Sequence, residues 1–318
     1  LAIESQNIQV QNSRVAYRDP EAIATLGHLN AGDMDFSQLN ADIPVFSFQN
    51  DTLYLQANSL TGNDKSGLQI HSLRAITRVT PGSIELKEAL ATMNRTSLDG
   101  DVVLYKNDKA SFDRMKVDLR HVKGYVDDLD RAIPPQKNPA LAKLHDMPFE
   151  VSGNISGWLQ NLQMENMRFL AGQATVAYFR GSVQNLTEPD KLGMNLNITR
   201  MESNRADLLR FMSLGDTPMD SLLAQPLPAY VNVSGDVSGN MAKLELTLGG
   251  EIGALQTSAA PADTSGSVLQ FDISGSLTQV NNPDSMGMDL TLNGVDAPRN
   301  FFAFLEPKGL RFPDHLEV

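Results

Sequence analysis

Alternating apolar and polar residues are the dominant pattern of this chain. In the segments 194–198, 244–248 and 269–273, every second residue is apolar and the residues between are polar. A period of two is typical of β-strands, because successive side chains point to opposite faces of a sheet. Shorter alternating stretches indicate further strands in the N-terminal part, at 8–10, 53–55, 68–70, 84–86 and 117–119.

Residues that favour turns separate these N-terminal stretches. Asp19-Pro20, Gly62-Asn63-Asp64, Pro81-Gly82 and Asp99-Gly100 each predict a turn. The proline-rich run 134–139 predicts a boundary between segments.

The second half of the chain contains an internal repeat. Residues 179–198 (FRGSVQNLTEPDKLGMNLNI) resemble residues 273–292 (ISGSLTQVNNPDSMGMDLTL), with a constant offset of 94 residues. An opening motif at 151–157 (VSGNISG) resembles 233–239 (VSGDVSG) at an offset of 82. The second copy therefore holds 12 additional residues, which we place in the Ala-, Ser- and Thr-rich stretch around 259–267.

The repeat divides the chain into four predicted segments. They are a β-rich N-terminal segment (1–145), a first β repeat with a short helix (146–226), a second such repeat (227–311) and the start of a further repeat (312–318). The last is inferred because its sequence, FPDHLEV, resembles the LPAYVNV that begins the second repeat. We therefore expect the natural protein to continue past Val318.

Glycine recurs on the apolar side of the predicted strands, at Gly153 and Gly235. A glycine in such a row removes bulk and permits a bend, and repeated bends curl a sheet. The sequence predicts a mainly β fold, a long, curled, repetitive antiparallel sheet that forms a trough (a β-taco), with a few short helices. Helices are expected at 204–212 and 297–305, each covering the end of the sheet section that it follows.

The apolar rows that contain these glycines are the candidate binding surface. Whether they line an open groove or a closed, dry core is not decided by alternation. The candidate groove-facing residues are Val151, Ile155, Val183, Met194, Leu196, Ile198, Val233, Val237, Leu246, Phe271, Ile273, Leu277, Met288, Leu290 and Leu292.

Composition restricts the classes of partner. The chain has 318 residues, of which 41% are hydrophobic and 20% charged, as in ordinary globular proteins. Its net charge of −12 is unfavourable for nucleic acid, which requires clustered Lys and Arg. There is no cysteine, so disulfides and thiolate metal sites are excluded. No apolar run approaches the roughly 18 residues of a membrane helix.

We find no spacing of residues that indicates catalysis or metal binding. The five histidines (28, 71, 121, 145 and 315) lack the paired spacing of zinc ligands on a helix. The acidic groups Asp33-Met-Asp35 and Asp127-Asp128-Leu-Asp130 lack the remaining ligands of a calcium loop, so we interpret them as a solvated face or a first helical turn. Ser-Gly pairs such as Ser152-Gly153 lie on predicted strands and do not fit a nucleophile elbow. We therefore expect no enzyme activity, no metal and no cofactor.

Several stretches resemble the large AsmA-like proteins, specifically the TamB (translocation and assembly module) homologues of the Bacteroidota. The similar stretches are 8–17 (IQVQNSRVAY), 35–54 (DFSQLNADIPVFSFQNDTLY), 65–73 (KSGLQIHSL), 84–97 (IELKEALATMNRTS) and 227–239 (LPAYVNVSGDVSG). The resemblance spans nearly all of the chain, although its motifs are degenerate strand patterns.

The resemblance implies a periplasmic protein that an N-terminal helix anchors in the inner membrane. It implies an apolar groove that conducts phospholipid acyl chains toward the outer membrane, and an Omp85-type outer-membrane partner. The anchor and the C-terminal family domain would lie outside this segment. Burying an acyl chain contributes about 0.8 kcal/mol per CH₂, so a continuous apolar surface would favour such transport.

Two other interpretations remain open at this stage. In the first, the apolar rows form a closed core and the protein is a structural scaffold. In the second, an exposed sheet edge serves as a chaperone-like platform that pairs with nascent outer-membrane strands. An enzyme that acts on cell-wall polymers is a remote third.

Overall fold

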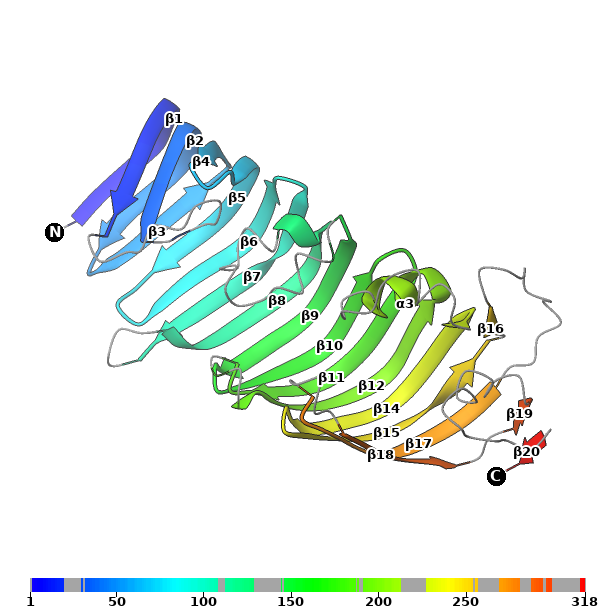
Figure 1. Ribbon diagram of the computed structural model, residues 1–318. Coiled ribbons are helices and arrows are strands. Elements are labelled where there is room, and N and C mark those ends of the chain that lie inside the picture. Colours follow the sequence, from blue (N-terminus) through cyan, green and yellow to red (C-terminus); the bar gives the residue numbers. More distant parts are fainter. Residues whose placement is uncertain are drawn as a thin grey trace. The chain divides into compact units, whose positions relative to one another are not determined.

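The computed structural model confirms a mainly β fold built on an antiparallel sheet of sixteen strands (Figure 1). It describes residues 2–19, 30, 32–107, 112–128, 144, 146–186, 188, 191–212, 227–253, 255–256, 269–280, 287–293, 296–298 and 315–317. Two further sheets, each of two strands, accompany the large one. The chain consists of two compact units, Leu1–Leu159 and Gln160–Val318.

The first unit contains strands β1 to β9. Their order in the sheet follows the sequence, except that β4 lies off the path and pairs with β2 and β5. The strands are β1 (Ala2–Arg18), β2 (Asp33–Gln49), β3 (Thr52–Ala57), β4 (Ser59–Asp64), β5 (Gln69–Val79), β6 (Ser83–Met93), β7 (Thr96–Lys106), β8 (Phe112–Tyr125) and β9 (Pro148–Trp158).

The second unit contributes strands in the order β10-β11-β12-β14-β15-β17-β18 to the sheet. β13 pairs with β16, and β19 pairs with β20. The elements are β10 (Asn161–Ala171), β11 (Thr175–Gln184), β12 (Gly193–Asn204), α3 (Arg205–Met212), β13 (Leu227–Pro228), β14 (Tyr230–Asn240), β15 (Lys243–Ile252), β16 (Leu255–Gln256), β17 (Leu269–Thr278), β18 (Gly287–Asn293), β19 (Asp296–Pro298) and β20 (His315–Glu317).

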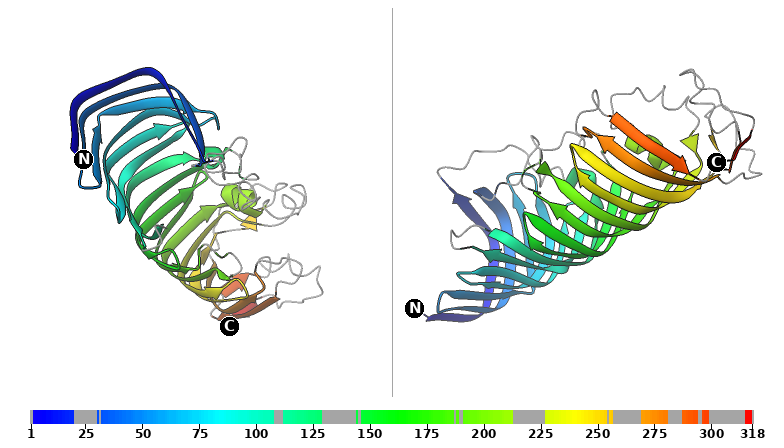
Figure 2. Two further views of the ribbon diagram at one scale, coloured as in Figure 1. Left: turned by 90° about the vertical axis from the view of Figure 1, so that its left-hand side faces the viewer. Right: turned by 90° about the horizontal axis from the view of Figure 1, so that it is seen from below.

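The strands of each unit bend along their length (Figure 2). Register shifts in many of them mark β-bulges, which increase strand twist and bend. Within β10 the shift lies between Met164 and Met167, and within β12 it lies between Ile198 and Met201. Asn166 in the first of these bulges has a φ of 52°. Comparable shifts occur in β1, β2, β6 and β8.

The repeat in the sequence is matched by a repeat in backbone conformation. Gly153 and Gly235 have φ values of 136° and 140°, and Gly181 and Gly275 have φ values of 151° and 149°. Only glycine adopts this region without strain. At Gly235, moreover, an added Cβ would lie 2.0 Å from the carbonyl oxygen of Thr247 on the neighbouring strand. The glycines therefore permit the same close approach of strands in both copies.

Helix α3 is joined to the β10–β11 turn by one buried carboxylate. Asp207, which is 2% exposed, accepts hydrogen bonds from the backbone N–H groups of Gln173, Ala174 and Thr175 and from the Thr175 hydroxyl. Burial raises the pKa of Asp207, but the hydrogen bonds from Ala174, Gln173 and Thr175 outweigh burial, and its pKa is lowered. Asn204 caps the N-terminus of α3, because its side-chain oxygen accepts a hydrogen bond from the Asp207 N–H at 2.9 Å.

Two of the turn predictions are wrong. Gly62, Asn63 and Asp64 lie within β4, and Asp99-Gly100 lies within β7. Gly100 lies opposite a bulge in β8, and a Cβ at Gly100 would lie 2.6 Å from the carbonyl oxygen of Asp118. The prediction at Pro81-Gly82 is confirmed, because these residues connect β5 to β6.

Other predictions fall wholly or partly outside the described residues. These include the Pro-rich run 134–139, the inserted stretch 259–267 and most of the second predicted helix. Of that helix, Ala297 and Pro298 lie instead in strand β19, and 299–305 are outside the described residues. The predicted segments 1–145, 146–226, 227–311 and 312–318 remain predictions. The repeat-based boundary at 145–146 precedes β9, whereas the two compact units meet at Leu159.

Candidate functional site

Four cross-strand rows of mainly apolar side chains run across one face of the second unit. Strand pairing places their members side by side, and we call this surface the apolar face. The rows are Leu162–Val183–Met194–Gly239–Leu244–Leu277–Met288, Met164–Gly181–Leu196–Val237–Leu246–Gly275–Leu290, Met167–Phe179–Ile198–Gly235–Leu248–Ile273–Leu292 and Phe169–Ala177–Met201–Val233–Gly250–Phe271.

The opposite face of the same strands is polar. One of its rows is Asp236–Thr247–Ser274–Thr291, and the next is Ser238–Glu245–Ser276–Asp289. Exposure follows the same division. In β15, Lys243, Glu245 and Thr247 are exposed, whereas Leu244 is buried and Leu246 is half-buried. The sheet is thus two-sided, as the alternation in the sequence predicts.

The apolar face is only partly covered. Four of its side chains are buried, namely Leu162, Met167, Leu244 and Phe271, and its other apolar side chains are half-buried or exposed. Met288, Leu290 and Leu292 on β18 are 68%, 43% and 37% exposed. A closed sandwich core of this size would bury many large side chains completely. The face therefore presents apolar surface to its surroundings.

All fifteen candidate residues from the sequence lie on strands whose apolar side chains share one face within their own unit. Thirteen of them are members of the four rows above, and Phe271 is the buried one. The other two, Val151 and Ile155, lie on β9 of the first unit. There Val151 pairs with Val122, and Ile155 pairs with Val117.

Sequence alternation missed several members of the rows. Met164 and Met167 on β10 are three positions apart, as are Ile198 and Met201 on β12, yet each pair lies on the same face. A bulge inserts one extra residue into a strand, so two residues that are three positions apart on either side of it point to the same face. The one signal in the sequence that these residues belong to the apolar face is their apolar character, because their spacing does not follow the period of two.

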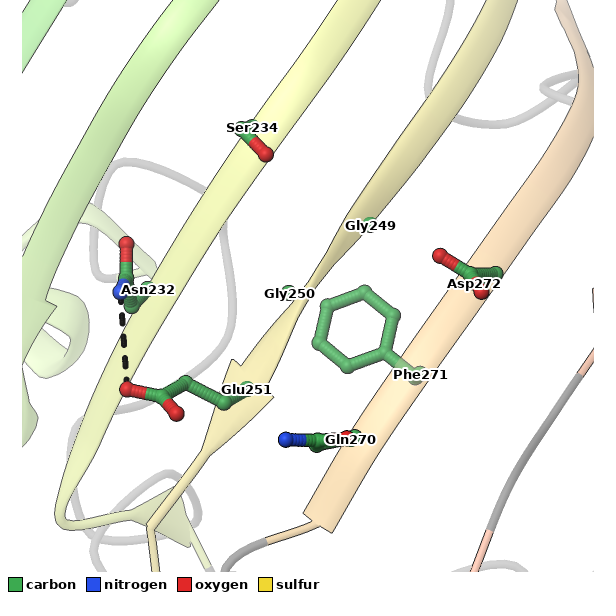
Figure 3. Close-up of a pocket in the computed structure, with 8 residues that line it drawn as sticks. All are labelled: Asn232, Ser234, Gly249, Gly250, Glu251, Gln270, Phe271 and Asp272. Atoms are coloured by element: carbon green, nitrogen blue, oxygen red, sulfur yellow. Dashed lines mark hydrogen bonds between the residues drawn. The ribbon is translucent and has the colours of Figure 1, made fainter.

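A depression of about 440 Å³ lies where β15 carries two adjacent glycines (Figure 3). Gly249 and Gly250 supply no side chains, and the lining includes Asn232, Glu251 and Asp272. The Asn232 amide donates to Glu251 at 3.5 Å. Phe271 extends from β17 toward β15, where its cross-strand partner is Gly250.

Metal ligands do not gather within the part of the chain that the structure describes. There, no group of three or more His, Cys, Asp or Glu residues could hold a metal ion. The acidic pair Asp127-Asp128 interacts instead with the β6–β7 turn, where Arg95 contacts Asp127 at 2.6 Å and its backbone N–H donates to Asp128 at 2.9 Å. No helix among the described residues is long and apolar enough to span a membrane.

No protein-family model, curated protein or solved structure matches the chain.

Proposed function

We propose that the apolar face binds the acyl chains of phospholipids and forms part of a path for lipid between two membranes. The observation that carries this proposal is the alignment of four apolar rows, three across seven strands and one across six, with side chains that remain partly exposed. An acyl chain of some fifteen methylenes is stabilised by about 12 kcal/mol on leaving water, at about 0.8 kcal/mol per CH₂. A continuous row favours sliding, because no single place binds tightly.

The resemblance to AsmA-like and TamB-type proteins supports a more specific proposal. In it, the chain is a periplasmic section of an inner-membrane-anchored protein that delivers phospholipid toward the outer membrane, with an Omp85-type protein as its partner. The net charge of −12 would keep such a section soluble. The role proposed for the chain is binding and conduction rather than catalysis.

The test is mass spectrometry of organic extracts from the purified chain after expression in bacteria. The double variant Ile198→Asp and Leu292→Asp places two charges on the apolar face, in the same row. We expect phospholipid to co-purify with the wild type and to fall at least about tenfold in the variant, because a carboxylate is costly to desolvate beside an acyl chain.

A matched control places the same charges on the same strands but on the polar face. Asn195 and Thr291 are both exposed there, so Asn195→Asp with Thr291→Asp should retain the lipid. Lipid-free wild type with intact far-UV circular dichroism would refute the lipid proposal and favour a scaffold. Equal loss in both double variants would show that the apolar face is not the site.

The edge of the sheet favours a second candidate function. β1 is 17 residues long and is the end strand of the sheet order, paired with β2. Its free edge could accept an added strand from an unfolded outer-membrane protein. Hydrogen exchange would test this, because added strands should slow exchange of β1 amides. If an excess of a peptide from an outer-membrane strand leaves the exchange of the β1 amides unchanged, strand addition at β1 is excluded.

A further inference from the structure

An arginine-lined cavity lies in the second unit, on the polar side of β10, β11 and β12. It has a volume of about 760 Å³. Strand pairing places Arg168, Tyr178 and Arg200 in one cross-strand row, and Arg180 pairs with Asn197 in the adjoining row. Neighbouring strands are about 4.8 Å apart, so the long arginine side chains reach a common volume.

Among the described residues, the lining of this cavity is rich in hydrogen-bond donors and contains no carboxylate. The nine described lining residues are the three arginines, Tyr178, two asparagines and Thr199, all of which can donate, and the apolar Met167 and Phe179. In a chain of net charge −12, three cations without an acid in the same lining are unexpected. Glu165, in the adjacent β10 bulge, is not part of the lining.

Several arginines elsewhere in the described chain are paired with carboxylates. In the first unit, Arg120 contacts Asp99 at 2.7 Å and Asp101 at 3.1 Å. At the cavity, Arg200 forms an ion pair with Glu202 outside the lining. For Arg180, which is exposed, no salt bridge to a described carboxylate is present. The cavity thus retains an unneutralised guanidinium.

We propose that this cavity is a binding site for a phosphate group, carried by a lipid headgroup or by a soluble phosphate ester. Planar guanidinium groups donate paired hydrogen bonds that match phosphate oxygens. The Tyr178 ring and the arginine stems supply apolar walls for the group that bears the phosphate. Tyr178 and Arg180 alternate with Phe179 and Gly181, so these two polar side chains lie on the face opposite the apolar rows. Met167 and Phe179 of the third apolar row also belong to the lining, so the cavity adjoins the proposed acyl-chain surface.

The test measures binding of two probes to the complete chain. Isothermal titration calorimetry uses inorganic phosphate, and vesicle flotation uses phosphatidylcholine with or without phosphatidylglycerol. We expect Arg180→Gln to weaken binding at least about tenfold and Arg180→Lys to weaken it less, because lysine retains the charge but not the paired donors. The control Arg78→Gln removes one exposed cation, which pairs with Glu85 at 3.8 Å, and should change binding less than about twofold.

The two probes distinguish the sources of the phosphate. Saturable binding of inorganic phosphate that Arg180→Gln abolishes would support the site with free phosphate esters as ligands. Flotation only with the vesicles that contain phosphatidylglycerol, without binding of inorganic phosphate, would support a lipid headgroup if Arg180→Gln also loses this flotation. Binding of neither probe, or equal loss in Arg78→Gln, would overturn the proposal. The variant Leu292→Asp should retain phosphate binding even where it loses co-purified lipid, which separates the two proposals.

Discussion

Removal of the Asp207 carboxylate is the sharpest test of how α3 is attached to the sheet. The Asp207→Ala change eliminates hydrogen bonds from the N–H groups of Ala174 at 2.8 Å and Thr175 at 2.9 Å, from the Thr175 hydroxyl at 3.0 Å, and from Gln173. Gln173 and Ala174 are exposed, so water replaces the carboxylate for them. Thr175 is 4% exposed, and its N–H would stay buried without an acceptor.

The expected loss of stability follows from these different surroundings. An unsatisfied buried N–H costs about 1–3 kcal/mol, and hydrogen bonds to a charged acceptor contribute somewhat more than neutral ones. We therefore expect Asp207→Ala to lower the free energy of unfolding by about 2–4 kcal/mol. Urea unfolding and hydrogen exchange at residues 173–175 would measure this change.

The lowered pKa of Asp207 adds a dependence on pH. Its contribution to stability is complete above the ordinary carboxyl pKa of about 4 and is lost as the pH falls through the lower folded-state pKa. The wild-type chain should therefore have a higher free energy of unfolding than Asp207→Ala at all pH values except in strong acid. The control Asp289→Ala removes an exposed carboxylate from β18 and should have little effect. A loss below about 0.5 kcal/mol for Asp207→Ala would refute the reasoning.

Two further substitutions test the geometry of the sheet. Gly235→Ala should destabilise the chain by more than about 2 kcal/mol in urea unfolding, because the φ of 140° and the Thr247 carbonyl both oppose a Cβ. Gly82→Ala, where a Cβ would contact nothing within 4 Å, is the control and should change stability by less than about 1 kcal/mol. Phe271→Ala should cost about 3 kcal/mol in the same assay, because Phe271 is 7% exposed and lies opposite Gly250 on the neighbouring strand. A cost below about 1 kcal/mol would show that its ring does not stabilise β15.

The sequence by itself determined the class of fold and the composition of the two faces. Strict alternation in 244–248 and 269–273 specifies strands and a side for each residue, because a strand has a fixed period of two. The same period placed the repeated glycines on the apolar side of their strands, and their matching φ values show that the repeat extends to the backbone conformation. The fifteen candidate residues share faces because they were chosen by that period.

Only the tertiary structure decided what depends on pairing between distant segments. Bulges change the period locally, so Met167 and Met201 could not be assigned to a face from spacing. Asp99-Gly100 resembles a turn in sequence, yet its partner strand holds it within β7. Arg168, Arg180 and Arg200 are scattered along the chain and form a cavity only because three strands lie side by side. Cross-strand register is a property of contacts between strands, and a local pattern of residues does not contain it.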